Sequence, residues 1–467
     1  MTESLSQLKY ILFFISLFIG VPLGYTLSLK YPIIERIIFF MMMFFTVRME
    51  DINFVSRETF RLTSRGFEIG MVDLCTLIIF LIILKRRDYY HLHLPPGSWT
   101  FLLYLIFSAV SIFNAAIPLF SWFEIWKMLR MFIFFYVVYN YVNSFDQFND
   151  FLKGVAAVTI YIFVEVMIQK YIEGRFQSFG PFPHQNSLVM YSIILGSLIF
   201  SYLLNKKDIS NLHFSYWLLF FAMTSVSIIS TLSRAGLVLY ALAIAVVLGL
   251  SFLSGSSAKK VMVSVLLIVV SLSILGKAWN SISERFQTAP MESANVRKDL
   301  ATAAVNMAND KLFGVGLNNF GIKINPPYSY GAHIEMHDPE DETEQNGLVE
   351  TVYLMVAAES GWHTMLIFLI FLFYYFFMNV SNMFKYVGSD YQYFAIGLTG
   401  GLLAIYLEST LEWVLKQTNN FYQIMLMFAM IAVMSKLEKR YRYHKKQMPR
   451  NLSTHQRIAF TGGNNAG

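Results

Sequence analysis

The sequence predicts an all-α, polytopic membrane protein with one large extracytoplasmic loop. Of its 467 residues, 56% are hydrophobic and only 14% are charged, and 44 are phenylalanine. Apolar runs long enough to cross roughly 30 Å of hydrocarbon recur along nearly the whole chain, which excludes a single soluble core. The only cysteine, Cys75, lies inside such a run, so neither a disulfide framework nor a cysteine metal site is expected.

About 12 to 13 spans are predicted from these runs, and the first is interpreted as a retained span rather than a cleaved signal peptide. We place them at residues 8–28, 33–47, 69–85, 100–115, 120–142, 151–171, 185–204, 212–231, 235–254, 260–278, 349–378, 391–409 and 419–435.

Basic residues indicate which ends of the spans face the cytoplasm. Residues 436–450 contain seven Lys or Arg against one Glu, and short basic loops occur at 85–87, 206–207 and 259–260. With these loops inside, the polar segments 48–68, 173–186, 230–236 and 279–348 lie on the outer face. The chain then divides into N-terminal membrane helices (1–278), a large outer loop (279–348), C-terminal membrane helices (349–435) and a basic, partly disordered cytoplasmic tail (436–467).

The stretch "STLSRAG" at residues 230–236 places Arg234 between two apolar spans. One interpretation is that its side chain simply reaches the lipid headgroups. However, the surrounding residues are small, which lets a ligand approach closely, and a guanidinium suits bidentate binding of a phosphate or diphosphate. Arg175 and Arg297 are also predicted on the outer face and could join such a site.

The large loop contains the predicted amphipathic helix "NVRKDLATAAVNMAND", starting at residue 295. Asn295 is expected to cap it, and Gly314 and Gly316 are expected to end it in a tight turn. Its predicted apolar face is formed by Val296, Leu300, Ala303 and Met307. The helix is expected to lie along the membrane surface and cover a cavity; the alternative is a packing helix without a chemical role.

Two further segments carry candidate catalytic groups. In "GPFPHQN" (180–186), the prolines present His184 and Asn186 where a span begins, although His184 could instead be a structural histidine. In the long predicted span 349–378, Glu350 and Glu359 are ionisable groups near or inside lipid, which usually face a cavity or a partner. The loop 333–345 contains two histidines and six carboxylates, but its proline and acidic run favour a solvated loop over a metal site.

Taken together, these segments resemble the O-antigen ligase and polymerase family of membrane glycosyltransferases. Four motifs in order carry the resemblance, across about residues 175 to 410: "GPFPHQN", "STLSRAG", "VRKDLATAAVNMANDKLFGVGLNNF" and "ETVYLMVAAESGWHTMLIF". The last is similar to a His-Asn-x-Tyr-Leu pattern followed by Glu-x-Gly. Here Glu350 replaces the histidine and Thr351 the asparagine, a departure that favours a polymerase over a histidine-dependent ligase.

The resemblance implies a GT-C-like bundle that transfers a glycan from undecaprenyl diphosphate to an acceptor hydroxyl, without a cofactor, nucleotide sugar or metal. Arg234, Arg297 and Arg175 would hold the donor diphosphate, and Glu350 or His184 would be the general base of an inverting reaction. The remaining positions, in supporting roles, are Asn186, Gly314, Gly316, Tyr353 and Glu359.

The predicted function is polymerisation of lipid-linked repeat units into a surface polysaccharide (O-antigen, capsule or exopolysaccharide) on the outer face of the inner membrane. The alternatives are a ligase that transfers the glycan to lipid A-core or another acceptor, and a flippase for the lipid-linked repeat. A flippase predicts internal repeats and midplane charges, which the sequence does not show. Expected partners are the lipid-linked donor, the acceptor glycan, the bilayer, and the chain-length regulator and flippase of the same pathway; nucleic acid is not expected.

Overall fold

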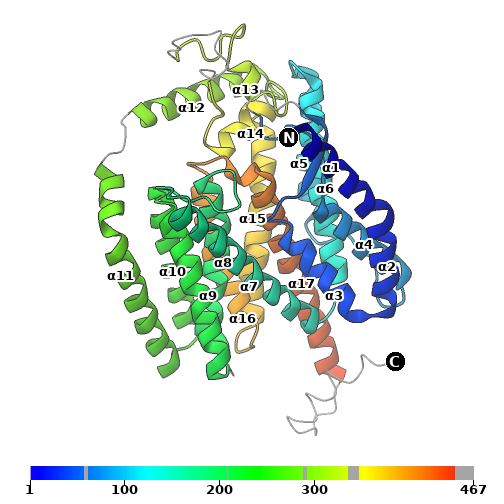
Figure 1. The fold of residues 1–467 in the computed structure, drawn as a ribbon, viewed down its shortest axis with the longest axis vertical. Helices are drawn as coiled ribbons and strands as arrows, with labels where there is room; N and C mark the ends of the chain where they lie inside the picture. The colour runs from blue at the N-terminus through cyan, green and yellow to red at the C-terminus, as the bar shows by residue number, and fades with distance from the viewer. Residues whose placement is uncertain (1, 57–61, 208, 288–291, 335–345, 448–467) are drawn as a thin grey trace.

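The computed structural model describes residues 2–56, 62–207, 209–287, 292–334 and 346–447. Most of these residues are helical (Figure 1). The elements are α1 (Thr2–Ile15), η1 (Ser16–Gly20), α2 (Val21–Lys30), α3 (Pro32–Phe44), β1 (Asp51–Ser56), β2 (Gly66–Gly70), α4 (Met71–Lys85), α5 (Ser98–Val110), η2 (Ser111–Asn114), α6 (Pro118–Tyr141), α7 (Phe145–Met167), η3 (Ile168–Ile172), α8 (Gln185–Asn205), α9 (Asn211–Ser230), α10 (Arg234–Leu253), α11 (Ala258–Gln287), α12 (Glu292–Asp310), α13 (Phe320–Lys323), α14 (Val352–Ser360), α15 (Trp362–Lys385), α16 (Gln392–Glu408), η4 (Val414–Lys416) and α17 (Thr418–Gln447).

The predicted all-α polytopic fold is confirmed. Within the described residues, eight helices are long and apolar enough to cross a membrane. They are Leu8–Lys30, Phe145–Ile172, Gln185–Asn205, Asn211–Ser230, Arg234–Leu253, Ala258–Lys277, Trp362–Lys385 and Thr418–Lys439. This number is smaller than the number of predicted spans because other helices of the bundle are short, such as α16, or carry several charges, such as α6.

Two helices occupy the centre of the bundle. In both α8 and α17, about nine tenths of the apolar stretch is buried against other helices, whereas the stretches at the N-terminus and in α11 are mostly exposed, as expected of lipid-facing helices. Helix α16 packs closely against α8 and α10. A Cβ at Gly397 would lie 2.9 Å from Leu198 Cα, and one at Gly400 would lie 2.7 Å from the Ala243 carbonyl oxygen. Small residues therefore allow close helix contacts here.

The predicted single span 349–378 is wrong, because the chain forms two helices, α14 and α15, separated at Gly361. Gly361 has a φ of 91°, which a residue with a side chain rarely adopts. The turn after α12 fits into this break: the amides of Val315 and Gly316 donate to the carbonyls of Ala358 and Glu359, at 2.9 and 3.0 Å. The break could not be seen in the hydropathy, because the sequence is apolar on both sides of it. The last carbonyl groups of α14 accept hydrogen bonds from the backbone of the turn after α12.

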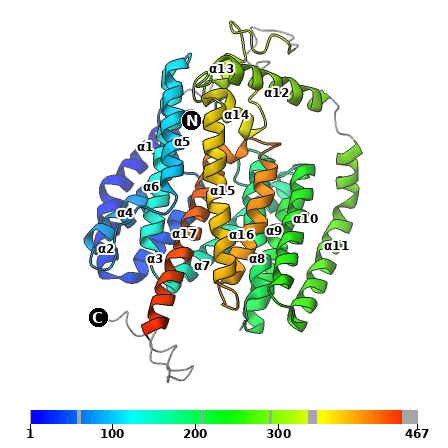
Figure 2. The same ribbon diagram turned by 180° about the vertical axis from the view of Figure 1, so that it is seen from behind.

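Helix α12 lies across one end of the bundle (Figures 1 and 2). Leu300, Ala303 and Met307 are buried against a small apolar cluster that includes Val349 and Met355, so this part of the predicted apolar face is confirmed. Two details of the prediction are wrong. Asn295 lies inside the helix, which already includes Glu292, so it is not the cap. Val296 is 48% exposed and does not belong to the buried face.

The described parts of the predicted outer segments lie at the end of the bundle that α12 covers (Figure 1). The connection between β1 and β2 contacts the turn after α12, since the amide of Thr63 donates to Asn318 Oδ1 at 2.9 Å. The α8–α9 connection, which contains Lys206 and Lys207, and the start of α11, which contains Lys259 and Lys260, lie at the opposite end (Figure 1). The predicted outer segments and these lysines therefore lie at opposite ends of the bundle.

Candidate functional site

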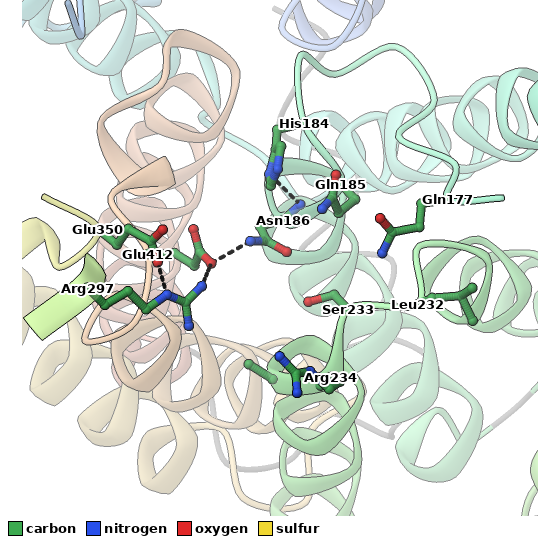
Figure 3. A pocket seen from close by; sticks show the side chains of 11 residues that line it. Gln177, His184, Gln185, Asn186, Leu232, Ser233, Arg234, Arg297, Glu350 and Glu412 are labelled. Atoms are coloured by element: carbon green, nitrogen blue, oxygen red, sulfur yellow. Dashed lines mark hydrogen bonds and ion pairs between the residues drawn. The ribbon is translucent and has the colours of Figure 1, made fainter. Parts of the chain in front are cut away.

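A cavity of about 430 Å³ opens at the α12 end of the bundle (Figure 3). We call it the outer pocket. Five separate stretches of the chain contribute to it, from the loop before α8 to the loop after α16. The residues that line it are Gln177, His184, Gln185, Asn186, Leu232, Ser233, Arg234, Ala235, Arg297, Glu350 and Glu412.

The turn between α9 and α10 places Arg234 in the pocket. Leu232 has a φ of 52°, a left-handed conformation that is unusual for a residue with a side chain and reverses the chain tightly. Ser233 then caps α10 by accepting a hydrogen bond from the Gly236 amide at 3.3 Å. A Cβ at Gly236 would lie 2.4 Å from Val189 Cγ1, so glycine lets α10 approach α8 closely at this turn.

Arg234 is the first residue of α10 and is half-buried. Among the residues that the structure describes, its guanidinium has no hydrogen-bond or ion-pair partner. The N-terminus of α8 also reaches the pocket, through Gln185 and Asn186. Helix N-termini favour anions because of their free amides and the helix dipole. An unpaired guanidinium next to two such termini is suited to binding a phosphate group.

The loop before α8 is fixed by one buried glutamine side chain. Gln169 donates to the Gly180 carbonyl at 2.7 Å, and its Oε1 accepts from the amides of Phe179 and Gly180 at 2.9 and 2.8 Å. The Ser178 amide also donates to the Ser230 carbonyl at 3.1 Å, which joins this loop to the turn that carries Arg234. These hydrogen bonds fix the loop before α8 against the turn that carries Arg234.

His184 caps the N-terminus of α8, and its Nδ1 accepts a hydrogen bond from the Asn186 amide at 3.3 Å. Burial lowers the pKa of His184, which favours the neutral ring. A neutral histidine that accepts at Nδ1 carries its proton at Nε2. In this arrangement His184 is a hydrogen-bond donor toward a ligand.

Two carboxylates share one guanidinium on the opposite wall of the pocket (Figure 3). Arg297 Nε forms an ion pair with Glu350, and Arg297 Nη2 lies 3.4 Å from Glu412 Oε1, which also accepts a hydrogen bond from Asn186. Burial raises the pKa of Glu350, while Arg297 acts in the opposite direction. Burial and the nearby Glu350 carboxylate raise the pKa of Glu412 to about 8, despite Arg297 and Asn186.

Residues 218–369 match the family model Wzy_C, described as O-Antigen ligase. This region is similar to the O-antigen ligase family. The match confirms the predicted assignment to the O-antigen ligase and polymerase family, and it includes Arg234, Arg297 and Glu350. His184 and Glu412 reach the same pocket from outside the matched region. A search of curated proteins found no match. The family assignment implies glycan transfer of the ligase or polymerase type by a multi-pass membrane protein.

Five of the residues predicted for the site line the outer pocket: His184, Asn186, Arg234, Arg297 and Glu350. Arg175 does not line it. Its Nε lies 2.6 Å from Glu173 Oε2, and its guanidinium stacks on the Phe179 ring at 4.6 Å. The structure therefore gives Arg175 partners within its own loop.

The other predicted positions do not line the pocket. Gly314 has a φ of 67°, and a Cβ there would lie 2.4 Å from the backbone of Glu359 and Ser360, so the turn after α12 needs a glycine to contact α14. Gly316 has a φ of 113° and approaches Ala115 in the same way. Tyr353 donates its hydroxyl to the Tyr406 carbonyl at 2.9 Å, which joins α14 to α16.

Glu359 belongs to a second group of charges, which we call the buried cluster: Glu124, Lys127, Glu359 and Lys416. Lys416 Nζ lies 2.9 Å from Glu359 and 3.6 Å from Glu124, and Lys127 Nζ lies 2.8 Å from Glu124. All four side chains are at most 3% exposed. Ser64 and Thr63 also donate to Glu124, at 2.6 and 3.0 Å. The cluster joins α6, α14 and the segment before α17, and it does not line the pocket.

Glu412 is an ionisable pocket residue that sequence reasoning missed. It lies in "ESTLEW" (408–413), in the connection between the last two predicted spans. The available signal was an ionisable residue at the mouth of a span, the same signal that selected Arg234 and Glu350. Gln177 and Gln185 were missed as well, because uncharged amides in a loop carry no comparable signal.

No group of three or more His, Cys, Asp or Glu side chains placed to hold a metal ion occurs within the described residues. His333 lies at the surface, with Nε2 at 3.0 Å from the Asp299 carbonyl oxygen. The rest of the acidic loop, including His337 and residues 338–344, lies outside the described residues.

Proposed function

We propose that this protein polymerises undecaprenyl-diphosphate-linked oligosaccharide repeat units into a surface polysaccharide, at the outer face of the cytoplasmic membrane. The observation that carries the proposal is the outer pocket, in which an unpaired guanidinium and a pair of carboxylates lie on opposite walls. The family assignment supports glycan transfer by this pocket.

The donor diphosphate binds at Arg234, at the N-termini of α8 and α10. Transfer breaks the bond between the anomeric carbon and the diphosphate oxygen, so negative charge grows on the leaving diphosphate. Donors already aimed at that position stabilise this charge in the transition state. Arg234 and the Nε2–H group of His184 supply such donors, and they allow a good leaving group to depart without a metal ion.

The acceptor hydroxyl binds next to Glu350. Its oxygen attacks the anomeric carbon from the face opposite the diphosphate, its proton passes to the Glu350 carboxylate, and the electron pair of the broken bond goes to the diphosphate. Attack from the opposite face inverts the anomeric configuration. Glu350 is suited to the role of general base because its raised pKa lies closer to the operating pH than that of an exposed carboxylate.

Polymerase and ligase differ in the acceptor. Glu350 stands where the family's ligase pattern has a histidine, which favours the polymerase. The name of the matched family, O-antigen ligase, favours the ligase. In a ligase of this kind the acceptor is lipid A-core. The two functions are distinguished by supplying the purified protein with a lipid-linked oligosaccharide, alone or together with lipid A-core.

We expect chains of several repeat units on the lipid carrier when the lipid-linked donor is supplied alone. Transfer to lipid A-core without extension of the donor would identify a ligase instead. Activity that persists in a chelator and needs no nucleotide sugar is expected in either case. No product with either acceptor from a folded preparation would contradict the proposed function.

A further inference from the structure

Glu412 has an unusual environment for a carboxylate. Its side chain is 10% exposed, and both of its hydrogen-bond donors, Asn186 and Arg297, approach the same oxygen, Oε1. Within the described part of the chain, both protein donors reach Oε1 and no hydrogen bond to Oε2 occurs. This pattern agrees with a carboxylic acid, which accepts at one oxygen and carries its proton on the other.

The charges around Glu412 also favour a proton on it. Arg297 is the only cation within ion-pair distance of either Glu350 or Glu412 among the described residues, and its Nε is engaged by Glu350. A second buried negative charge on the same guanidinium would be uncompensated. The other ionisable groups near Glu412 are His184 and Arg234 in the pocket and Glu408 one turn back in the chain, and none adds a compensating partner.

We propose that Glu412 is a positioning residue that works as a neutral carboxylic acid, which holds Arg297 in place so that Glu350 alone is ionised and serves as the base. This inference rests on the proposed function and concerns the same pocket. With Glu412 neutral, two guanidiniums face a single carboxylate and the pocket keeps a net positive charge for the donor diphosphate. When Glu350 takes the acceptor's proton, the positive charge increases as the diphosphate departs.

The rise of the Glu412 pKa to about 8 agrees with this role and predicts its pH dependence. Below that pH, Glu412 is protonated and the pocket carries its net positive charge. Above that pH, Glu412 ionises. The two arginines, Arg234 and Arg297, then face two negative carboxylates, the net charge of these four groups is zero, and the pocket binds the diphosphate more weakly. The loss of activity at alkaline pH should therefore appear mainly as a rise in the donor KM.

The test is the pH profile of purified wild-type protein and its Glu412→Gln, Glu350→Gln and Glu173→Gln variants with the lipid-linked donor. Glutamine resembles a protonated acid, so we expect E412Q to lose only about threefold in kcat at neutral pH, whereas E350Q should lose about 100-fold or more. E412Q should also lack the alkaline rise in donor KM that the wild type shows near pH 8. Glu173 is an exposed carboxylate at the same end of the protein, and E173Q should match the wild type.

The inference is overturned if folded E412Q is as inactive as E350Q, or if it keeps the wild-type alkaline profile. It is also overturned if the wild-type donor KM stays constant across this range, a result that does not depend on any variant folding. Failure of the proposed function is distinguishable from these outcomes, because it would leave all four proteins without polymer or ligated product. Size-exclusion chromatography in detergent shows which variants are folded.

Discussion

The outer pocket and the buried cluster each bring two acidic and two basic side chains together, yet they differ in exposure and in pairing. In the buried cluster, every charged group has an opposite charge within 3.6 Å and none is more than 3% exposed. In the pocket, Arg234 has no partner among the described residues, while Arg297 is shared by two carboxylates. Charges that are buried and balanced stabilise the arrangement of helices, whereas unbalanced charges facing a cavity remain available to a ligand.

The largest expected effect comes from removing the unpaired cation. We expect Arg234→Ala to reduce transfer by about 100- to 1,000-fold, because a donor aimed at the leaving diphosphate is lost. Arg234→Lys keeps the charge but not the bidentate geometry, so it should retain part of the activity. Polymer length on gels and initial rates with purified protein measure both. Arg175→Ala is the matched comparison, and because Arg175 is paired with Glu173, its effect should be below about threefold.

Substitutions in the buried cluster should lower the stability of the protein. Lys416→Met leaves Glu359 buried without its ion pair, and breaking such a pair costs about 3 to about 5 kcal/mol. Thermal unfolding in detergent should show a clear loss for K416M, and the double change Lys416→Met with Glu359→Leu should recover much of it. Equal stability of wild type and K416M would contradict the assignment of this cluster to structure.

A variant of Gly314 tests the backbone contact between the turn after α12 and helix α14. Gly314→Ala places a Cβ 2.4 Å from the α14 backbone at a φ of 67°, so the turn after α12 must move. We expect a cost of about 1 to about 3 kcal/mol and a fall in activity, because α12 carries Arg297. A change at Gly388, which also has a positive φ but open space around it, should lower stability without the same loss of activity.

The smallest expected effect is a shift in pH dependence. The Asn186 side chain donates to Glu412 and lowers its pKa, so Asn186→Ala should raise that pKa further. The alkaline rise in donor KM should then move to higher pH. The pH profile of purified N186A measures the shift, and movement to lower pH would contradict the assigned hydrogen bond.

The general fold was predictable because membrane spans follow from hydropathy, and Arg234, Glu350 and His184 were found because polar groups at the mouths of spans are costly. Three features were not predictable in this way. The break at Gly361 depends on a backbone contact with a distant turn. Lys127 and Glu124 lie within a predicted span and are tolerated only because they pair with each other and with Lys416. The partnership of Glu412 with Arg297 joins residues that are 115 positions apart.

The central claim, that the outer pocket binds the donor diphosphate through Arg234, is tested most directly by binding. A prenyl diphosphate and the matching prenyl monophosphate can be titrated into purified wild-type protein, R234A and R175A. The account predicts that the wild type and R175A bind the diphosphate more tightly than the monophosphate, and that R234A binds the diphosphate about 100-fold more weakly. Equal diphosphate affinity of wild type and folded R234A would contradict it.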